Sequence, residues 1–164
     1  MKHKAIISAV LGLALFSLGQ YVYAEGGSIT LQASCQVKVM DSVQIGGRSI
    51  TFSHLSCGVI NTAGSGFMHK VSMFGPVWSE SSKSASRLLG HTVIADKDKD
   101  EIYMSIERRG AAPDPGTGRW TITGGSGKYA GVSGSGTYDV AYLPSVHEGL
   151  LLNISMLKGT YQIP

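Results

Sequence analysis

The sequence predicts an all-β protein, a single-domain, eight-stranded antiparallel up-and-down β-barrel. Glycine supplies 22 of the 164 residues and charged residues only 15%, which favours a turn-rich β protein over a helical one. Eight segments are strand candidates, several of them with alternating apolar and polar residues, and no segment has the period of an amphipathic helix. The connections are mostly short enough for hairpins. Closing the sheet into a barrel removes the edges that so few charges would leave unprotected.

The longest alternation covers residues 28 to 39, where Ile29 to Val39 place every second side chain on one face. The next segment, 49 to 60, begins with Ile50 and Phe52 in phase and then slips near His54, which predicts a bulge or bend there. Further strands are expected at 67–74 (ended by Gly75 and Pro76), 91–95, 102–107, 119–123, 138–142 and 150–163, with a bend at Gly159 and surface loops at 79–86 and 110–118.

Residues 1 to 24 have the pattern of a cleaved export signal. Lys2 and Lys4 precede an apolar stretch from Ala5 to Leu18, and Val22 and Ala24 provide the small residues that signal peptidase requires. The alternative is an uncleaved N-terminal anchor, although the stretch is shorter than the roughly 20 residues that span a bilayer. We expect a cut after Ala24, a β-barrel domain over residues 25–164 and a secreted or periplasmic protein with no later membrane span.

The charge balance argues against a polyanionic partner. Without Lys2 and Lys4, 12 basic residues face 11 acidic ones, so we expect no binding to nucleic acid. The two cysteines, Cys35 and Cys57, lie on either side of Gly46-Gly47, where the chain can reverse and bring them opposite each other. An even cysteine count in an oxidising compartment favours a disulfide, and two buried free thiols are the alternative.

Residues 116 to 138 read GTGRWTITGGSGKYAGVSGSGTY, a strand, a glycine-rich turn and an aromatic strand. This pattern resembles the allene oxide cyclase and dirigent-type barrel superfamily, and more closely the small uncharacterised secreted bacterial proteins with that barrel. The acidic turn before EIYMSIE and the terminal KGTYQIP are also similar to those proteins. The resemblance implies a calycin-like or allene oxide cyclase-like barrel with an apolar cavity. No motif here matches the catalytic residues of the cyclases, so catalytic residues stay unknown.

Three motifs that resemble cofactor or metal sites have simpler explanations, and we expect no cofactor. Gly125 to Lys128 lacks both the Ser or Thr and the helix of a phosphate-binding loop, so its glycines are assigned to a tight turn. Asp96, Asp98 and Asp100 have the opening spacing of a calcium loop, but Glu101 stands where the loop needs glycine. We therefore expect a solvated hairpin turn, with weak calcium binding as the alternative. No two histidines have metal-ligand spacing, so no metal site is predicted.

The ligand-binding candidates are the aromatic residues expected on inward faces. Eight strands leave barely enough room for side chains, so these aromatics could simply fill the core. They could instead wall a pocket for a flat or apolar molecule. The four candidates are Phe52, Trp120, Tyr138 and Tyr142.

Three functions fit this sequence. The first is a non-enzymatic module that binds a small apolar ligand. The second is a cyclase or isomerase of the allene oxide cyclase type, which holds an apolar substrate in one conformation. The third is a factor that binds a partner protein through the loops at 79–86 or 110–118. An open cavity with convergent polar groups fits the first two, and a solid barrel fits the third.

Overall fold

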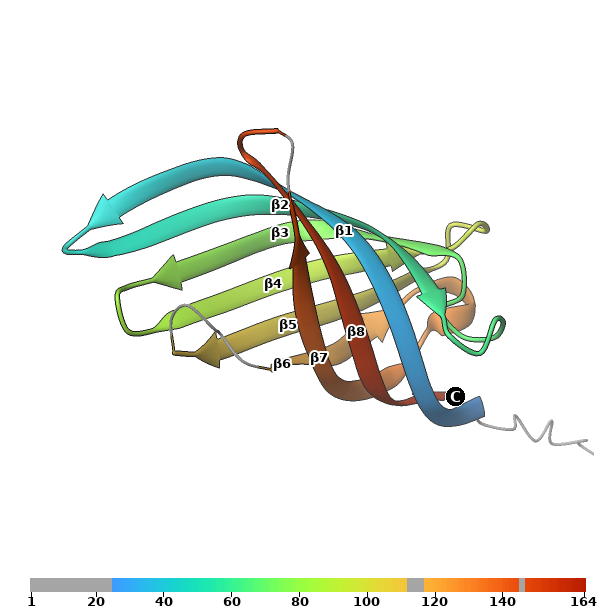
Figure 1. Cartoon of the computed structure of the whole chain (residues 1–164). Coiled ribbons are helices and arrows are strands. Elements are labelled where there is room, and N and C mark those ends of the chain that lie inside the picture. Colours follow the sequence, from blue (N-terminus) through green and yellow to red (C-terminus); the bar gives the residue numbers. More distant parts are fainter. Residues whose placement is uncertain (1–24, 112–116, 145–146) are drawn as a thin grey trace, which may run out of the picture.

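The computed structural model describes residues 25–111, 117–144 and 147–164, which form a closed barrel of eight antiparallel strands in sequence order (Figure 1). The last strand pairs with the first, from Glu25 opposite Ile163 to Lys38 opposite Leu150. The predicted fold class is therefore confirmed. The elements are β1 (Glu25–Ile45), β2 (Arg48–Asn61), β3 (Val71–Ser81), β4 (Ser86–Ala95), β5 (Glu101–Gly110), β6 (Gly118–Gly125), the short 3₁₀ helix η1 (Gly127–Tyr129), β7 (Ser133–Leu143) and β8 (Leu150–Ile163).

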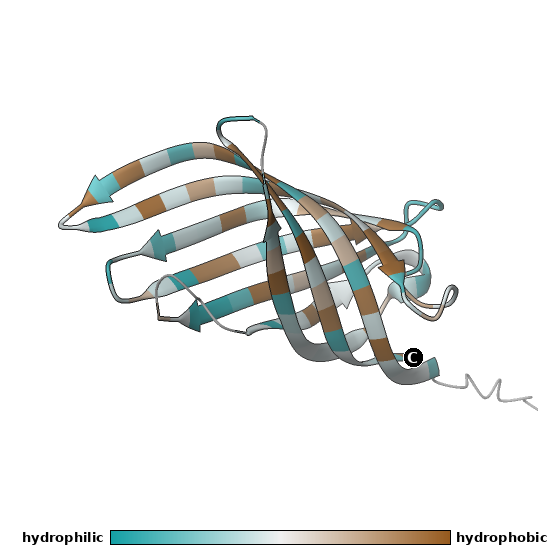
Figure 2. Ribbon diagram, in the orientation of Figure 1, coloured by the Kyte–Doolittle hydropathy of each residue, from teal (hydrophilic) through white to brown (hydrophobic). Residues whose placement is uncertain are grey.

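Side chains alternate between the inside and the outside of the barrel, and Figure 2 shows hydrophobic and hydrophilic residues following one another along the strands. On β1, Leu31, Ala33 and Cys35 are almost completely buried. On β5, Ile102 and Met104 continue the same inner face. Burying one face of every strand provides the main stabilisation of such a fold.

One end of the barrel is filled. Phe67 and Met68, which the sequence placed at the start of a strand, lie instead in the connection before β3 and are buried. The Phe67 ring stacks on Tyr161, with ring centroids 4.1 Å apart. Trp120 lies against Gly136 and Gly159, which are paired across β7 and β8, and Cβ atoms added at these glycines would overlap the indole. The missing side chains of these two glycines thus make room for the largest residue of the core.

Most strands are longer than predicted, and β3 and β4 extend into the surface loop expected at 79–86. β3 continues through Gly75 and Pro76 to Ser81, and β4 begins at Ser86, so the connection shrinks to residues 82–85. The ladder between β3 and β4 is interrupted at Gly75 and Pro76, then resumes with Val77 opposite Gly90. Because proline has no N–H to donate, it is tolerated where a ladder is interrupted in this way.

The irregularity expected near His54 lies on the partner strand instead. The register shifts between Val39 and Asp41 on β1, whereas β2 keeps its alternation from one end to the other. Beyond this bulge, β1 and β2 continue past the barrel as a projecting hairpin, seen at the left of Figure 1. The predicted signal segment, residues 1–24, lies outside the described residues. Within the described part of the chain, no helix has the length and apolar character needed to cross a membrane.

Candidate functional site

The end of the barrel opposite the filled end, where Phe67 is buried, contains a cavity of about 400 Å³. This volume is within the range of small-molecule sites. Tyr142, with 57% of its surface exposed, belongs to the cavity wall, so the cavity opens to solvent at this end. Its deeper walls are largely apolar and come from β1, β2, β3, β5 and β8; among them are Val37, Leu55, Met73, Met104, Ile106 and Leu157.

A small group of polar side chains converges on this apolar space. Arg108 of β5 is only 7% exposed, and its Nη2 donates a hydrogen bond to the Tyr142 hydroxyl at 2.8 Å. Asn153 and Ser155 of β8 are also buried, and the Ser155 hydroxyl donates to Asn153 Oδ1 at 3.1 Å. Apolar walls with a few oriented polar groups are typical of ligand sites.

Tyr138 is a further buried residue of the cavity wall that carries a polar group. Its ring lies over the backbone of Gly118, its partner across β6 and β7, where any side chain would overlap the ring. Its hydroxyl is buried and has no hydrogen-bond partner among the described residues. Burial raises the pKa of Tyr138 to about 12, although the positive charge of Arg108 acts in the opposite direction. The phenol is therefore neutral at physiological pH, and its O–H donor is unused within the described residues.

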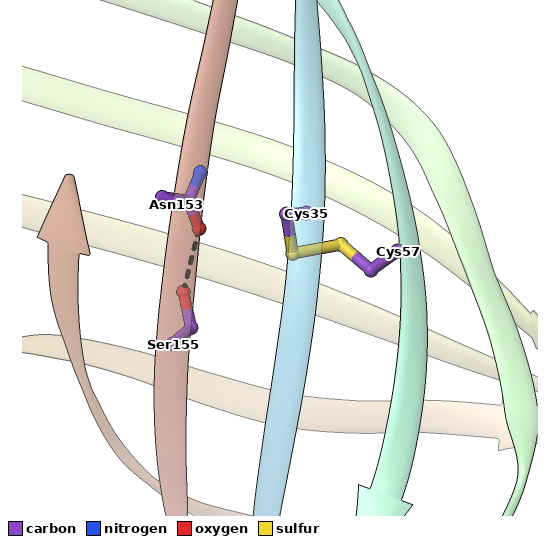
Figure 3. Close-up of a disulfide and its surroundings, with 4 residues drawn as sticks. All are labelled: Cys35, Cys57, Asn153 and Ser155. Atoms are coloured by element: carbon purple, nitrogen blue, oxygen red, sulfur yellow. Dashed lines mark hydrogen bonds between the residues drawn. A yellow bond between two sulfur atoms is a disulfide. The ribbon is translucent and has the colours of Figure 1, made fainter. Parts of the chain in front are cut away.

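The predicted disulfide is confirmed. Cys35 on β1 and Cys57 on β2 are directly opposed in the register and bonded to each other (Figure 3). Cys35 also lines the cavity and lies opposite Asn153 on the other neighbouring strand. The cross-link thus holds together two strands that form the cavity wall.

The four aromatic residues predicted to bind a ligand lie in three different places in the structure. Tyr138 and Tyr142 line the cavity, whereas Trp120 is buried in the core at the filled end and donates to the Thr137 carbonyl oxygen at 3.1 Å. Phe52 does not face inward. It is 48% exposed on the outer face, because β2 alternates without a break and Cys57, Leu55 and Ser53 occupy its inward positions.

Sequence reasoning missed Arg108, Asn153 and Ser155. Arg108 continues the alternation of Ile102, Met104 and Ile106, so the inward direction of its side chain could have been found by extending that pattern by one step. Its charge made an exposed position the default expectation.

The outer groove that contains Phe52 is the other apolar feature of this region. It runs over β1 to β4 and is bounded by Met40, Trp78, Leu89 and His91. The Arg87 guanidinium lies over the Trp78 ring, 5.8 Å from its centroid. Most residues of this groove, among them Phe52, Trp78 and Leu89, project from the outer face of the sheet, although Ser53 and Val77 line both the groove and the cavity.

The three aspartates of the predicted calcium alternative surround a lysine ammonium group. Lys128, at the η1 turn, forms ion pairs with Asp96, with Asp98 at 3.0 Å and with Asp100 at 3.6 Å. Burial opposes ionisation of Asp96, but hydrogen bonds from Lys128, from the Tyr129 hydroxyl and from backbone N–H groups lower the pKa of this carboxyl below its ordinary value. Within the described ranges, no three His, Cys, Asp or Glu residues form a group that could hold a metal ion. The cluster therefore links the β4–β5 turn to the β6–β7 turn.

Comparison with known proteins supports the fold. No protein-family model matches the chain, and no curated protein sequence matches it significantly. The structure is similar to that of a pterocarpan synthase dirigent protein, with a TM-score of 0.50 and 13% identity over 99% of this chain and 100% of that one. A protein of unknown function from the DUF3224 family of Shewanella oneidensis MR-1 aligns with a TM-score of 0.48 and 12% identity, over 82% of this chain and 97% of that one. The chain thus has a dirigent-like barrel fold, and the narrower resemblance to allene oxide cyclases and secreted bacterial proteins stays a prediction.

Proposed function

We propose that this protein binds a small apolar molecule inside its barrel. The observation that carries the proposal is the cavity of about 400 Å³, open at one end, with apolar walls and a few convergent polar groups. Transfer of an apolar molecule from water into such a space is favourable in proportion to the area it buries. Tyr138 and Tyr142 are the proposed aromatic contacts. Binding of a partner protein through the loops at 79–86 or 110–118 is a separate prediction, and it does not depend on the cavity.

The test is binding of the neutral dye Nile red and its displacement by 1-decanol. Val140→Phe places a larger ring at a cavity-lining position of β7 and should weaken dye binding. Phe52→Ser removes an aromatic wall of the outer groove and should leave dye binding unchanged. Circular dichroism must first show that both variants are folded. Absence of displaceable binding in the wild type, or loss of binding only in Phe52→Ser, would refute the proposal. Chemical conversion of a bound molecule would favour the cyclase or isomerase alternative.

We also infer that the protein is exported and works in the periplasm or outside the cell. The basic and apolar pattern of residues 1–24 supports this inference, and so does the disulfide, because such bonds persist mainly in oxidising compartments. The mass of the protein purified from its native host should correspond to a chain that begins at Glu25. A mass that includes residues 1–24 would contradict signal cleavage.

A further inference from the structure

We propose that the ligand of the cavity is a monocarboxylate, with its apolar chain in the barrel and its carboxylate at Arg108. The proposal rests on the proposed function, since it names the chemical class of the molecule bound there. It begins from the burial of Arg108, since only 7% of the surface of this residue is exposed. A charged side chain is seldom buried to this extent without a partner of opposite charge.

The guanidinium of Arg108 lacks such a partner within the described residues. Its Nη2 donates to Tyr142, and the Tyr142 ring lies 5.9 Å from the guanidinium carbon, but both contacts are to a neutral group. Its Nε is buried without any hydrogen-bond partner. Glu107 pairs with Arg109 at 3.9 Å, and Glu80, which also lines the cavity, pairs with Arg48 at 2.7 Å. Among the described residues, no carboxylate therefore forms an ion pair with Arg108.

The alternation of β5 directs Arg108 at the cavity, because Arg108 continues the inward positions of Met104 and Ile106. Arg108 pairs with Leu88 of β4, and the β5–β6 ladder ends one residue earlier, with Glu107 opposite Arg119. Its side chain reaches instead to β7, where it meets the Tyr142 hydroxyl. The unpartnered Tyr138 hydroxyl belongs to the same cavity wall. Arg108 and Tyr138, each with a donor that is unused within the described residues, thus belong to one cavity wall.

A carboxylate matches these donors better than other small groups do. Its two oxygens accept parallel hydrogen bonds from a guanidinium, and a phenol can add a third bond. A neutral apolar molecule would leave the charge buried and unpaired, which disfavours it. The apolar walls below Arg108 require that the remainder of the molecule be hydrocarbon. The cavity volume, at the lower end of the range for ligand sites, favours a chain of moderate length.

The experiment compares decanoate with 1-decanol and decyl phosphate as competitors of Nile red in the wild type and in variants. In the wild type we expect decanoate to displace the dye at a concentration at least about tenfold lower than 1-decanol does, since hydrogen bonds to a charged group contribute that much. Arg108→Met should abolish this preference while retaining binding of the dye and of 1-decanol. Tyr138→Phe should reduce the affinity for decanoate severalfold and leave that for 1-decanol unchanged.

The neighbouring arginine provides the matched control. Arg109 points outward and its side chain is 64% exposed, so Arg109→Met removes the same charge one residue away and should retain the preference for decanoate. Equal displacement by decanoate and 1-decanol in the wild type would overturn the inference, as would a preference that survives in Arg108→Met or disappears in Arg109→Met. Tighter binding of decyl phosphate than of decanoate would overturn the choice of a carboxylate and indicate a phosphate as the anionic group of the ligand. If neither the dye nor 1-decanol binds to the wild type, the proposed function itself fails.

Discussion

Removal of the disulfide should lower the thermal stability of the barrel by an amount that follows from its position. The bond joins residues separated by 22 positions, and it closes the loop that contains the projecting β1–β2 hairpin. On the chain-entropy model, cross-linking a loop of this length destabilises the unfolded state by about 3 kcal/mol at 25 °C. A domain of about 140 residues unfolds with an entropy of about 0.3 kcal/mol per kelvin, so the loss corresponds to a decrease of about 10 °C in Tm.

The perturbation can be made in two ways that separate cross-linking from packing. Reduction of the wild type breaks the bond and leaves both sulfur atoms in place. The double variant Cys35→Ala/Cys57→Ala also removes the sulfur atoms, which are buried because the two residues are only 5% and 7% exposed. The reduced wild type should therefore lose about 10 °C, and the double variant slightly more because of the space left in the core.

The assay is thermal unfolding followed by circular dichroism, at several scan rates to check reversibility. Mass spectrometry under denaturing conditions confirms the redox state, since the oxidised chain is lighter by two hydrogen atoms. A reduced protein that unfolds within about 2 °C of the oxidised form would refute the reasoning. It would mean that contacts between β1 and β2 persist in the unfolded chain and already restrict it.

Two further predictions concern the filled end of the barrel and the aspartate cluster. Gly159→Ala would make a Cβ overlap the Ser135 carbonyl oxygen and lie 2.5 Å from the Trp120 ring, and should cost about 1–3 kcal/mol. Gly27→Ala, where a Cβ meets nothing within 4 Å, should leave urea unfolding unchanged, and similar losses in both variants would contradict the packing argument. The lowered pKa of Asp96 contributes stability that is present above the ordinary pKa of about 3.9 and is lost as pH falls toward the folded-state value. Lys128→Met should therefore lower stability at pH 7 and weaken its decrease between about pH 5 and pH 2, and an unchanged acid profile in urea titrations would contradict the role of the ion pair.

The strand pattern could be predicted from sequence because each strand buries one face, which imposes a period of two on the residues themselves. β1 and β5 illustrate this: the alternation of Ile29 to Val39 and of Ile102 to Ile106 is reproduced in the structure. Phe52 was assigned to the wrong face for a related reason. The extra residue lies on β1, and nothing in the sequence of β2 shows where its partner strand is irregular.

The cavity itself could be predicted only in part, since it depends on contacts between residues distant in sequence. Tyr138 and Tyr142 were identified because aromatic residues in an alternating segment are obvious candidates. Arg108 was not, because its charge made an exposed position the default expectation and because its hydrogen-bond partner Tyr142 comes from β7. The filled end could not be predicted either. Phe67 and Met68 have the apolar character of strand residues, and only the structure shows that they lie in the connection before β3 and are buried.

The difference between the two ends of the barrel follows from the sizes of the inward side chains. At the filled end, Gly136 and Gly159 admit Trp120, and Phe67 closes the remaining opening. At the other end, the inward positions of three strands carry small hydroxyl residues, which cannot fill the interior of an eight-stranded barrel. These residues are Thr51, Ser53, Ser79, Ser81 and Ser86. A core selected only for stability would place larger apolar residues there, so the open end, with its buried arginine, is the part of the fold that stability alone does not explain.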